Sequence, residues 1–165
     1  MARNDQSKRM ALGGVMAALA VVIMCLGGII PVATYVCPML CMLLLQFVLG
    51  SCGTRTAWAW YGAVALLSLL MGPDKEAAAV FAFLGYYPII RPALEKTRLK
   101  WLWKALLFNT AILTMYWLLM HLLGMDALIK EFSEMGTVML AVLLLAGNLT
   151  FFLLDRILPR FRWRR

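Results

Sequence analysis

Apolar and polar stretches alternate along this chain in blocks rather than residue by residue. Six apolar segments span residues 10–30, 32–49, 57–71, 77–90, 105–123 and 135–154. A helix that crosses a membrane needs roughly 17 to 25 mostly apolar residues. The third and fourth segments are short for a crossing, so they must recruit flanking residues or lie where the bilayer is thin. Were both re-entrant, the number of crossings would fall from six to four.

The pattern predicts an all-α integral membrane protein with six transmembrane helices in a single domain, residues 1–165. The helices are expected at residues 10–30, 36–50, 56–72, 75–90, 103–123 and 135–155. Pro31 and Pro38 bracket the first connection, which predicts that the second helix begins near Val36 after irregular chain. The run Gly72-Pro73-Asp74 predicts a tight turn between the third and fourth helices.

The basic residues divide the connections into two kinds. Fourteen of the 16 Lys and Arg residues fall in four short stretches, which alternate with three connections that are almost free of them. Short basic loops stay on the cytoplasmic side of a membrane, so this alternation predicts both termini in the cytoplasm. The basic stretches contain Arg3, Lys8, Arg9; Arg55; Arg91, Lys96, Arg98, Lys100, Lys104; and Arg156, Arg160, Arg162, Arg164, Arg165.

Composition supports a membrane location. The chain is 64% hydrophobic and 15% charged, whereas globular chains are about half apolar and a quarter charged. The net charge of +8 predicts contact with anionic lipids at the cytoplasmic rim rather than with nucleic acid. Residues 10–30 could be a signal peptide, but they are long and lack a small-x-small cleavage site, so they are expected to stay as the first helix. We expect a multi-pass protein of a bacterial plasma membrane.

The chain offers little for catalysis or for holding a cofactor. No predicted crossing has an acid or base in its middle, and no phosphate-binding glycine loop is present. Ser68 with the lone His121 on another helix is a poor nucleophile and base. Cys37 and Cys41 share a helix face, yet packing as small apolar side chains is favoured over a metal site. We therefore expect no enzyme, no catalytic residue, no metal and no cofactor.

Small residues form a stripe on the first predicted helix. Gly13 with Ala17 and Gly14 with Ala18 make two overlapping small-xxx-small pairs. Such pairs let another helix backbone approach closely. The partner helix can belong to the same chain or to a second subunit, and the sequence leaves both readings open.

These features resemble a known family. A basic start, the run Ala11-Leu-Gly-Gly-Val-Met-Ala-Ala-Leu-Ala20, a proline-containing outer loop and six helices in a chain of this length are similar to the substrate-binding S-components of energy-coupling factor (ECF) transporters. The resemblance implies uptake of a vitamin-like micronutrient, powered by an ECF coupling transmembrane subunit and cytoplasmic ATPases. It also implies that Gly14 and Ala18 form the docking pair, although Gly in the first place departs from the usual Ala-xxx-Ala. No signature identifies the substrate.

Candidate substrate-binding residues lie toward the predicted outer side. Tyr116, Trp117 and His121 could stack on and hydrogen-bond a flat heterocycle, or they could form an aromatic belt that faces lipid. Asp74 and Glu76 on the second outer connection could complete the pocket, or they could belong to a solvated turn. The sequence leaves these alternatives open.

Other polar residues are expected to have structural roles. Asn109 and Asn148 should lie at similar depth near the cytoplasmic third, where the two amides would pair across neighbouring helices. Tyr86 and Tyr87 are expected to anchor at the membrane interface. Residues 91–104 mix basic and aromatic side chains, which is typical either of an interfacial helix or of a plain basic loop.

Two hypotheses from different classes follow. The first is a membrane-embedded substrate-binding subunit of an ECF-type transporter. The alternative is a non-transporting multi-pass scaffold or assembly factor of the cell envelope, which needs no cavity. A lipid-handling enzyme would need acidic or histidine pairs at a membrane interface, and the sequence does not supply them.

Overall fold

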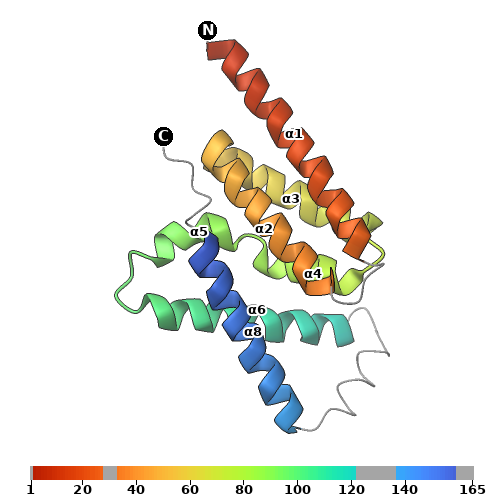
Figure 1. The fold of residues 1–165 in the computed structure, drawn as a ribbon, viewed down its shortest axis with the longest axis vertical. Coiled ribbons are helices and arrows are strands. Elements are labelled where there is room, and N and C mark those ends of the chain that lie inside the picture. The colour runs from red at the N-terminus through yellow and green to blue at the C-terminus, as the bar shows by residue number, and fades with distance from the viewer. Residues whose placement is uncertain (1, 28–32, 122–136, 159–165) are drawn as a thin grey trace.

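The computed structural model describes residues 2–27, 33–121 and 137–158, and these residues form an all-α fold, as the sequence predicts. Figure 1 shows the helices packed together into one bundle. The helices are α1 (Ala2–Gly27), α2 (Ala33–Cys52), α3 (Thr54–Met71), α4 (Lys75–Leu84), α5 (Tyr87–Leu94), α6 (Lys100–His121) and α8 (Thr137–Ile157).

The predicted boundaries fail most clearly at the second helix. We expected irregular chain up to Val36, but α2 is already helical at Ala33 and contains Pro38. Pro38 lies in the second turn, where its missing N–H removes a single backbone hydrogen bond and leaves the rest of the helix intact. The first helix also differs, because α1 extends through the polar start of the chain and begins at Ala2.

The fourth predicted helix is divided in two by Gly85 and Tyr86. Gly85 lies so close to the preceding turn that an added Cβ would be 2.3 Å from the carbonyl oxygen of Phe81 and 2.9 Å from its ring. Only glycine fits such an approach. The two short helices nevertheless follow the same direction, and Lys75–Leu94 is long and apolar enough to count as one candidate span.

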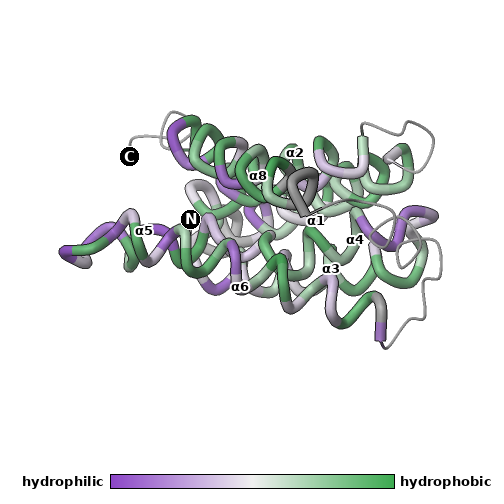
Figure 2. Tube along the Cα trace, turned by 90° about the horizontal axis from the view of Figure 1, so that it is seen from below, coloured by the Kyte–Doolittle hydropathy of each residue, from purple (hydrophilic) through white to green (hydrophobic). Residues whose placement is uncertain are grey.

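Within the described residues, four helical segments could cross a membrane by length and composition. They are Ser7–Gly27, Ala33–Cys52, Lys75–Leu94 and Lys100–Leu119. Figure 2 shows hydrophobic residues along the helices and hydrophilic ones gathered at the connection between α5 and α6. The protein is therefore a multi-pass membrane protein.

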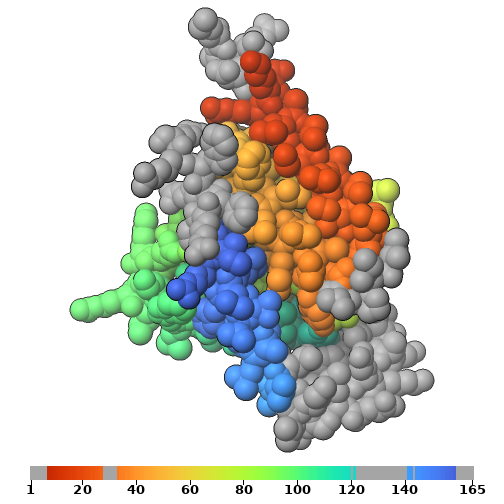
Figure 3. Space-filling model, in the orientation of Figure 1, coloured from red at the N-terminus to blue at the C-terminus, as the bar shows by residue number. Residues whose placement is uncertain are grey.

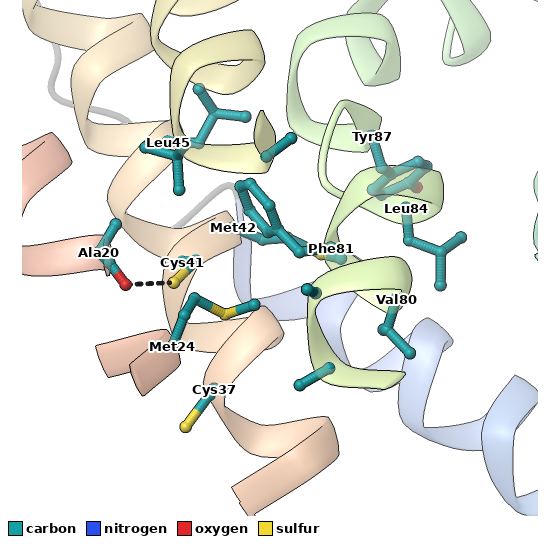
Figure 4. Close-up of a cluster of buried hydrophobic side chains, with 14 of the residues drawn as sticks. Ala20, Met24, Cys37, Cys41, Met42, Leu45, Val80, Phe81, Leu84 and Tyr87 are labelled. Atoms are coloured by element: carbon teal, nitrogen blue, oxygen red, sulfur yellow. Dashed lines mark hydrogen bonds between the residues drawn. The ribbon is translucent and has the colours of Figure 1, made fainter. Parts of the chain in front are cut away.

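The core lies where α1, α3 and α4 surround α2. Figure 4 shows Cys41 of α2 donating a hydrogen bond of 3.5 Å from its Sγ to the carbonyl oxygen of Ala20 in α1. On the other side of α2, α4 presents the consecutive small residues 77–79, which are all buried. Small side chains allow close contact on several sides, so α4 can pack against α2, α3 and α6 at once.

Hydrogen bonds join helix ends that are distant in sequence. The start of α2 meets the start of α4, because Thr34 Oγ1 donates to Asp74 Oδ2 at 2.7 Å. The same region meets the end of α6, where the phenol oxygens of Tyr35 and Tyr116 are 3.0 Å apart. We call this side of the bundle the tyrosine end.

The opposite side is formed by the other helix ends. Cys52 at the end of α2 donates to the carbonyl oxygen of Arg9 in α1 at 3.3 Å. Asp155 near the end of α8 contacts Arg91 of α5 and Lys104 of α6. We call this side the aspartate end. Among the described basic residues only Lys75 lies at the tyrosine end, and the described members of the four basic stretches lie at the aspartate end.

Candidate binding cavity

A cavity of about 270 Å³ lies between α2, α4, α6 and α8. Its size is close to the lower end of the range for small-molecule pockets, about 300 to 1,000 Å³. The walls are mostly apolar, and they include Met39 and Met42 of α2, Leu84 of α4, Ile112 of α6 and Leu144 of α8. An apolar cavity of this kind holds water poorly and favours an apolar occupant.

A polar cluster borders the cavity at the tyrosine end. Tyr35 and Tyr116 both line the cavity, and both phenols donate to Oε1 of Glu76, at 2.9 and 2.6 Å. Each phenol has one proton, which it can share with the carboxylate or with the other phenol 3.0 Å away, and each phenol oxygen can also accept. We call these three residues the tyrosine–glutamate cluster. It can receive a hydrogen-bond donor or a cation from a ligand.

Asp74 supports this cluster rather than joining it. Its Oδ1 accepts from the backbone N–H of Ala77 at 3.0 Å and caps the N-terminus of α4. Its Oδ2 accepts from Thr34 Oγ1. An N-cap aspartate stabilises the first turn of its helix, so Asp74 fixes the place of Glu76 two residues later and ties α4 to the start of α2.

Aromatic rings close the other end of the cavity. Phe108 of α6 and Phe151 of α8 stack with centroids 4.8 Å apart and an interplanar angle of 28°. Behind them, Tyr87 of α5 meets Phe151 edge to face at 4.6 Å. Such ring pairs add about 0.5 to 1.5 kcal/mol beyond the area that they bury. They form a rigid floor between the cavity and the aspartate end.

A buried charge cluster lies beyond this floor. Asp155 accepts from the Tyr87 phenol and from Arg91 Nε, both at 2.5 Å, and from Lys104 Nζ at 2.7 Å. Arg91 also pairs with Glu95 at 2.5 Å. The exposed fractions of the Lys104 and Asp155 side chains are 5% and 9%, so these charges are largely withdrawn from solvent. We call this the Asp155 cluster.

The Asp155 cluster corrects two sequence-based interpretations. Tyr87 was expected to anchor at the membrane interface, but it is fully buried and donates to Asp155. Arg91 and Lys104 were assigned to a basic surface block, whereas both turn inward to one carboxylate. The signal in the sequence was Asp155 itself, a lone acid directly after the apolar segment 135–154, which needs a cationic partner when it is buried.

The candidate site residues divide by helix face. Tyr116 and Glu76 come together at the cavity, and Tyr35, which the sequence did not single out, completes the cluster. Trp117 is 60% exposed and does not line the cavity. His121 stacks on Trp117 with centroids 5.1 Å apart. A role for Trp117 and His121 in binding stays a prediction.

The two small-residue pairs on α1 lie in different surroundings. Gly13 is buried, and a Cβ there would be 3.9 Å from the Thr56 side chain of α3, while Ala17 packs against the core. Gly14 and Ala18 are exposed, and nothing lies within 4 Å of a Cβ built at Gly14. Within the described residues, one pair therefore serves internal packing and the other stays available.

The predicted amide pair is confirmed. Asn109 Nδ2 donates to Asn148 Oδ1 at 3.2 Å, and Asn148 Nδ2 donates back to Asn109 Oδ1 at 3.0 Å. Each amide also donates to the carbonyl oxygen four residues earlier in its own helix, at 2.9 Å. The reciprocal pair fixes the register of α8 against α6 beside the cavity.

No group of three or more His, Cys, Asp or Glu side chains in the described ranges could hold a metal ion.

Comparison with protein-family models, with curated proteins and with solved structures finds no match to this chain.

Proposed function

We propose that the protein is a membrane-embedded binding subunit that captures a small organic molecule from outside the cell and releases it inward when partner proteins drive the change. The observation that carries the proposal is the cavity itself, an apolar space between four helices with a carboxylate and two phenols at one end. A scaffold needs no such space, because a filled helix bundle is more stable than one with a void.

The proposed orientation places six crossings in the membrane with the aspartate end in the cytoplasm. Basic residues mark the cytoplasmic side of membrane proteins, and the described ones gather at that end. Anionic lipids of the inner leaflet would face Arg55, Lys96, Arg98 and Lys100, which are exposed. The tyrosine–glutamate cluster then faces outward, toward the supply of substrate.

The proposed partners are an ECF-type coupling transmembrane subunit and cytoplasmic ATPases. Support comes from the resemblance of the first helix to S-components and from the exposure of Gly14 and Ala18, which leave a flat stripe on the outer face of α1. A second helix can approach such a stripe closely. The chain itself carries no nucleotide-binding loop, so energy for uptake must come from these partners.

Docking is tested by co-purification of the tagged protein with the coupling subunit and the ATPases from its own cells. The double variant Gly14→Leu with Ala18→Leu fills the stripe and is expected to lower recovery of both partners at least tenfold. The control is Val15→Leu with Leu19→Met, at exposed positions one residue further along α1. Equal recovery with the folded stripe variant would remove the docking proposal.

Binding is tested by mass spectrometry of small molecules released by heat from the purified protein. Tyr116→Phe combined with Glu76→Gln is expected to lose the molecule that copurifies with the wild type. The matched control is Thr114→Val, because Thr114 is exposed on the same helix and its hydroxyl donates only to the Thr110 carbonyl oxygen at 2.7 Å. Retention of the molecule by the double variant would refute the proposed site.

A further inference from the structure

The cavity has a closed back wall. Val80 and Leu84 of α4 and Phe108 of α6 line it and are only 6%, 4% and 7% exposed. Behind these residues α4 packs against α2, α3 and α6. Nothing can therefore enter the cavity from that side without separating packed helices.

The front edges of the cavity are exposed. Tyr35 of α2 and Leu144 of α8 line the cavity and are 45% and 37% exposed, and Ala146 and Thr150 of α8 also line it and are exposed. Residues that line the cavity and are also exposed on the protein surface mark an opening. They come from α2 and α8, so the opening lies between these two helices.

Packing of the helices agrees with a lateral opening. In the described part of the chain α8 packs mainly on α6, while α2 packs on α1, α3 and α4, and α2 and α8 do not form a closely packed pair. Figure 3 shows α8 beside α2 on one face of the molecule, with a small area of α6 visible between their lower ends. The wall formed by α8 is thus the least constrained side of the cavity.

The surface around this opening is apolar. On α2 the exposed neighbours are Val36 and Leu40, at 46% and 43%, and on α8 they are Leu145 and Leu149, at 71% and 64%. In a multi-pass membrane protein such side chains face lipid chains. The opening therefore connects the cavity with the hydrocarbon of the bilayer rather than with water.

The shape of the cavity suits a single hydrocarbon chain. Its lining on α8 extends from Leu144 to Leu154, which corresponds to about 15 Å at about 1.5 Å per residue. The hydrocarbon core of a bilayer is about 30 Å thick. The cavity thus extends over about one leaflet, with the tyrosine–glutamate cluster at one end and the aromatic floor at the other.

The tyrosine–glutamate cluster determines which polar group of a bound molecule fits at that end of the cavity. Glu76 accepts from two phenols, and among the described residues no Lys, Arg or His lies within ion-pair distance of its carboxylate. Lys75, its neighbour in sequence, donates instead to the carbonyl oxygen of Leu69 at 2.8 Å. A carboxylate whose described partners are neutral phenols favours a positively charged donor.

We propose that the cavity takes up, sideways from the bilayer between α2 and α8, a single-chain amphiphile with an amine head, its chain lying in the cavity and its ammonium group at Glu76. This inference rests on the proposed function and specifies its substrate class and its route of entry. The exposed α8 residues Ala146 and Thr150 form the edge that such a molecule must pass.

The test uses the full-length protein in lipid nanodiscs, with dodecylamine as the probe and native mass spectrometry to count bound copies. Ala146→Trp narrows the opening, and Thr150→Trp narrows it at a second place should the first variant fail to fold. The control is Leu149→Trp, which adds the same indole at an exposed α8 position that does not line the cavity. Propylamine has the same head without the chain, and dodecanol has the chain with an uncharged head.

We expect one dodecylamine bound to the wild type and to Leu149→Trp, and at least tenfold less bound to the variants at Ala146 and Thr150. Glu76→Gln is expected to abolish the preference for dodecylamine over dodecanol. Equal dodecylamine binding by all folded variants would overturn the lateral route. Binding of propylamine but not of dodecylamine would overturn the amphiphile while leaving a water-soluble substrate and the proposed function intact. Binding of no probe by the wild type would contradict the amphiphile, and the heat-release experiment above then decides the proposed function separately.

Discussion

The phenol of Tyr116 donates a hydrogen bond of 2.6 Å to Oε1 of Glu76 and thereby joins the end of α6 to the first turn of α4 across 40 residues of sequence. Glu76 is, among the described residues, the one carboxylate at hydrogen-bond distance from residues that line the cavity. Under the proposed function, the bond would also couple ligand binding to the packing of two helices.

Removing either partner should therefore change stability as well as binding. Hydrogen bonds to charged groups contribute about 1.5 to 3 kcal/mol; because Tyr35 also donates to Glu76, we expect Tyr116→Phe to lower the free energy of unfolding by about 1 kcal/mol. Thermal unfolding in detergent micelles, combined as a double-mutant cycle with Glu76→Gln, measures the coupling. Strictly additive effects of the two substitutions would show that the bond contributes nothing.

The Asp155 cluster predicts a larger loss. Asp155→Asn leaves the buried Lys104 and the adjacent Arg91 with only the exposed Glu95 as a shared carboxylate, at 3.8 and 2.5 Å. Breaking a buried ion pair by removing one partner costs about 3 to 5 kcal/mol, so the variant should unfold well below the wild-type temperature in the same micelles. Arg156→Gln is the control, because Arg156 is exposed and surface changes usually stay within about 0.5 kcal/mol. A variant at Asp155 as stable as this control would contradict the structural role of the cluster.

A backbone prediction concerns the connection between α2 and α3. Gly53 has φ +89° and ψ 170°, a conformation that is nearly restricted to glycine and costs other residues about 1 to 3 kcal/mol. Gly53→Ala should therefore destabilise the protein by that amount. Gly50, three residues earlier in α2, is helical with nothing within 4 Å of an added Cβ, and Gly50→Ala should be neutral or stabilising by up to about 1 kcal/mol. Measurement of both unfolding temperatures side by side checks the connection, and the opposite order would show that α2 and α3 are joined differently.

The sequence predicted where the helices lie along the chain better than which side of each helix faces the cavity. The block pattern located the apolar helices, and counting residues from the helix ends correctly paired Asn109 with Asn148. It could not separate Tyr116 from Trp117, because consecutive residues on a helix point about 100° apart. Which of the two lines the cavity depends on how α6 is rotated against α4, and that rotation is set by tertiary packing.

The sequence also did not predict the contacts between helix ends that are far apart along the chain. Asp155, Arg91 and Lys104 each lie in or beside a basic stretch, where a solvated or lipid-facing role is the ordinary expectation. These three residues meet because the end of α5, the start of α6 and the end of α8 lie on the same side of the bundle, within contact distance. Tyr35 was overlooked for the same reason, since its importance comes from α4 and α6 rather than from its own neighbours in sequence.

The most direct test of the account is the side of the membrane on which each end of the bundle lies. In a variant with its four cysteines replaced, single cysteines introduced at the exposed positions Lys8, Pro73 and Arg98 are labelled with a membrane-impermeant maleimide. We predict labelling of Pro73→Cys in intact cells, and labelling of Lys8→Cys and Arg98→Cys only after permeabilisation. Labelling of Lys8→Cys and Arg98→Cys from opposite sides, or protection of Pro73→Cys in intact cells, would contradict an outward-facing binding site.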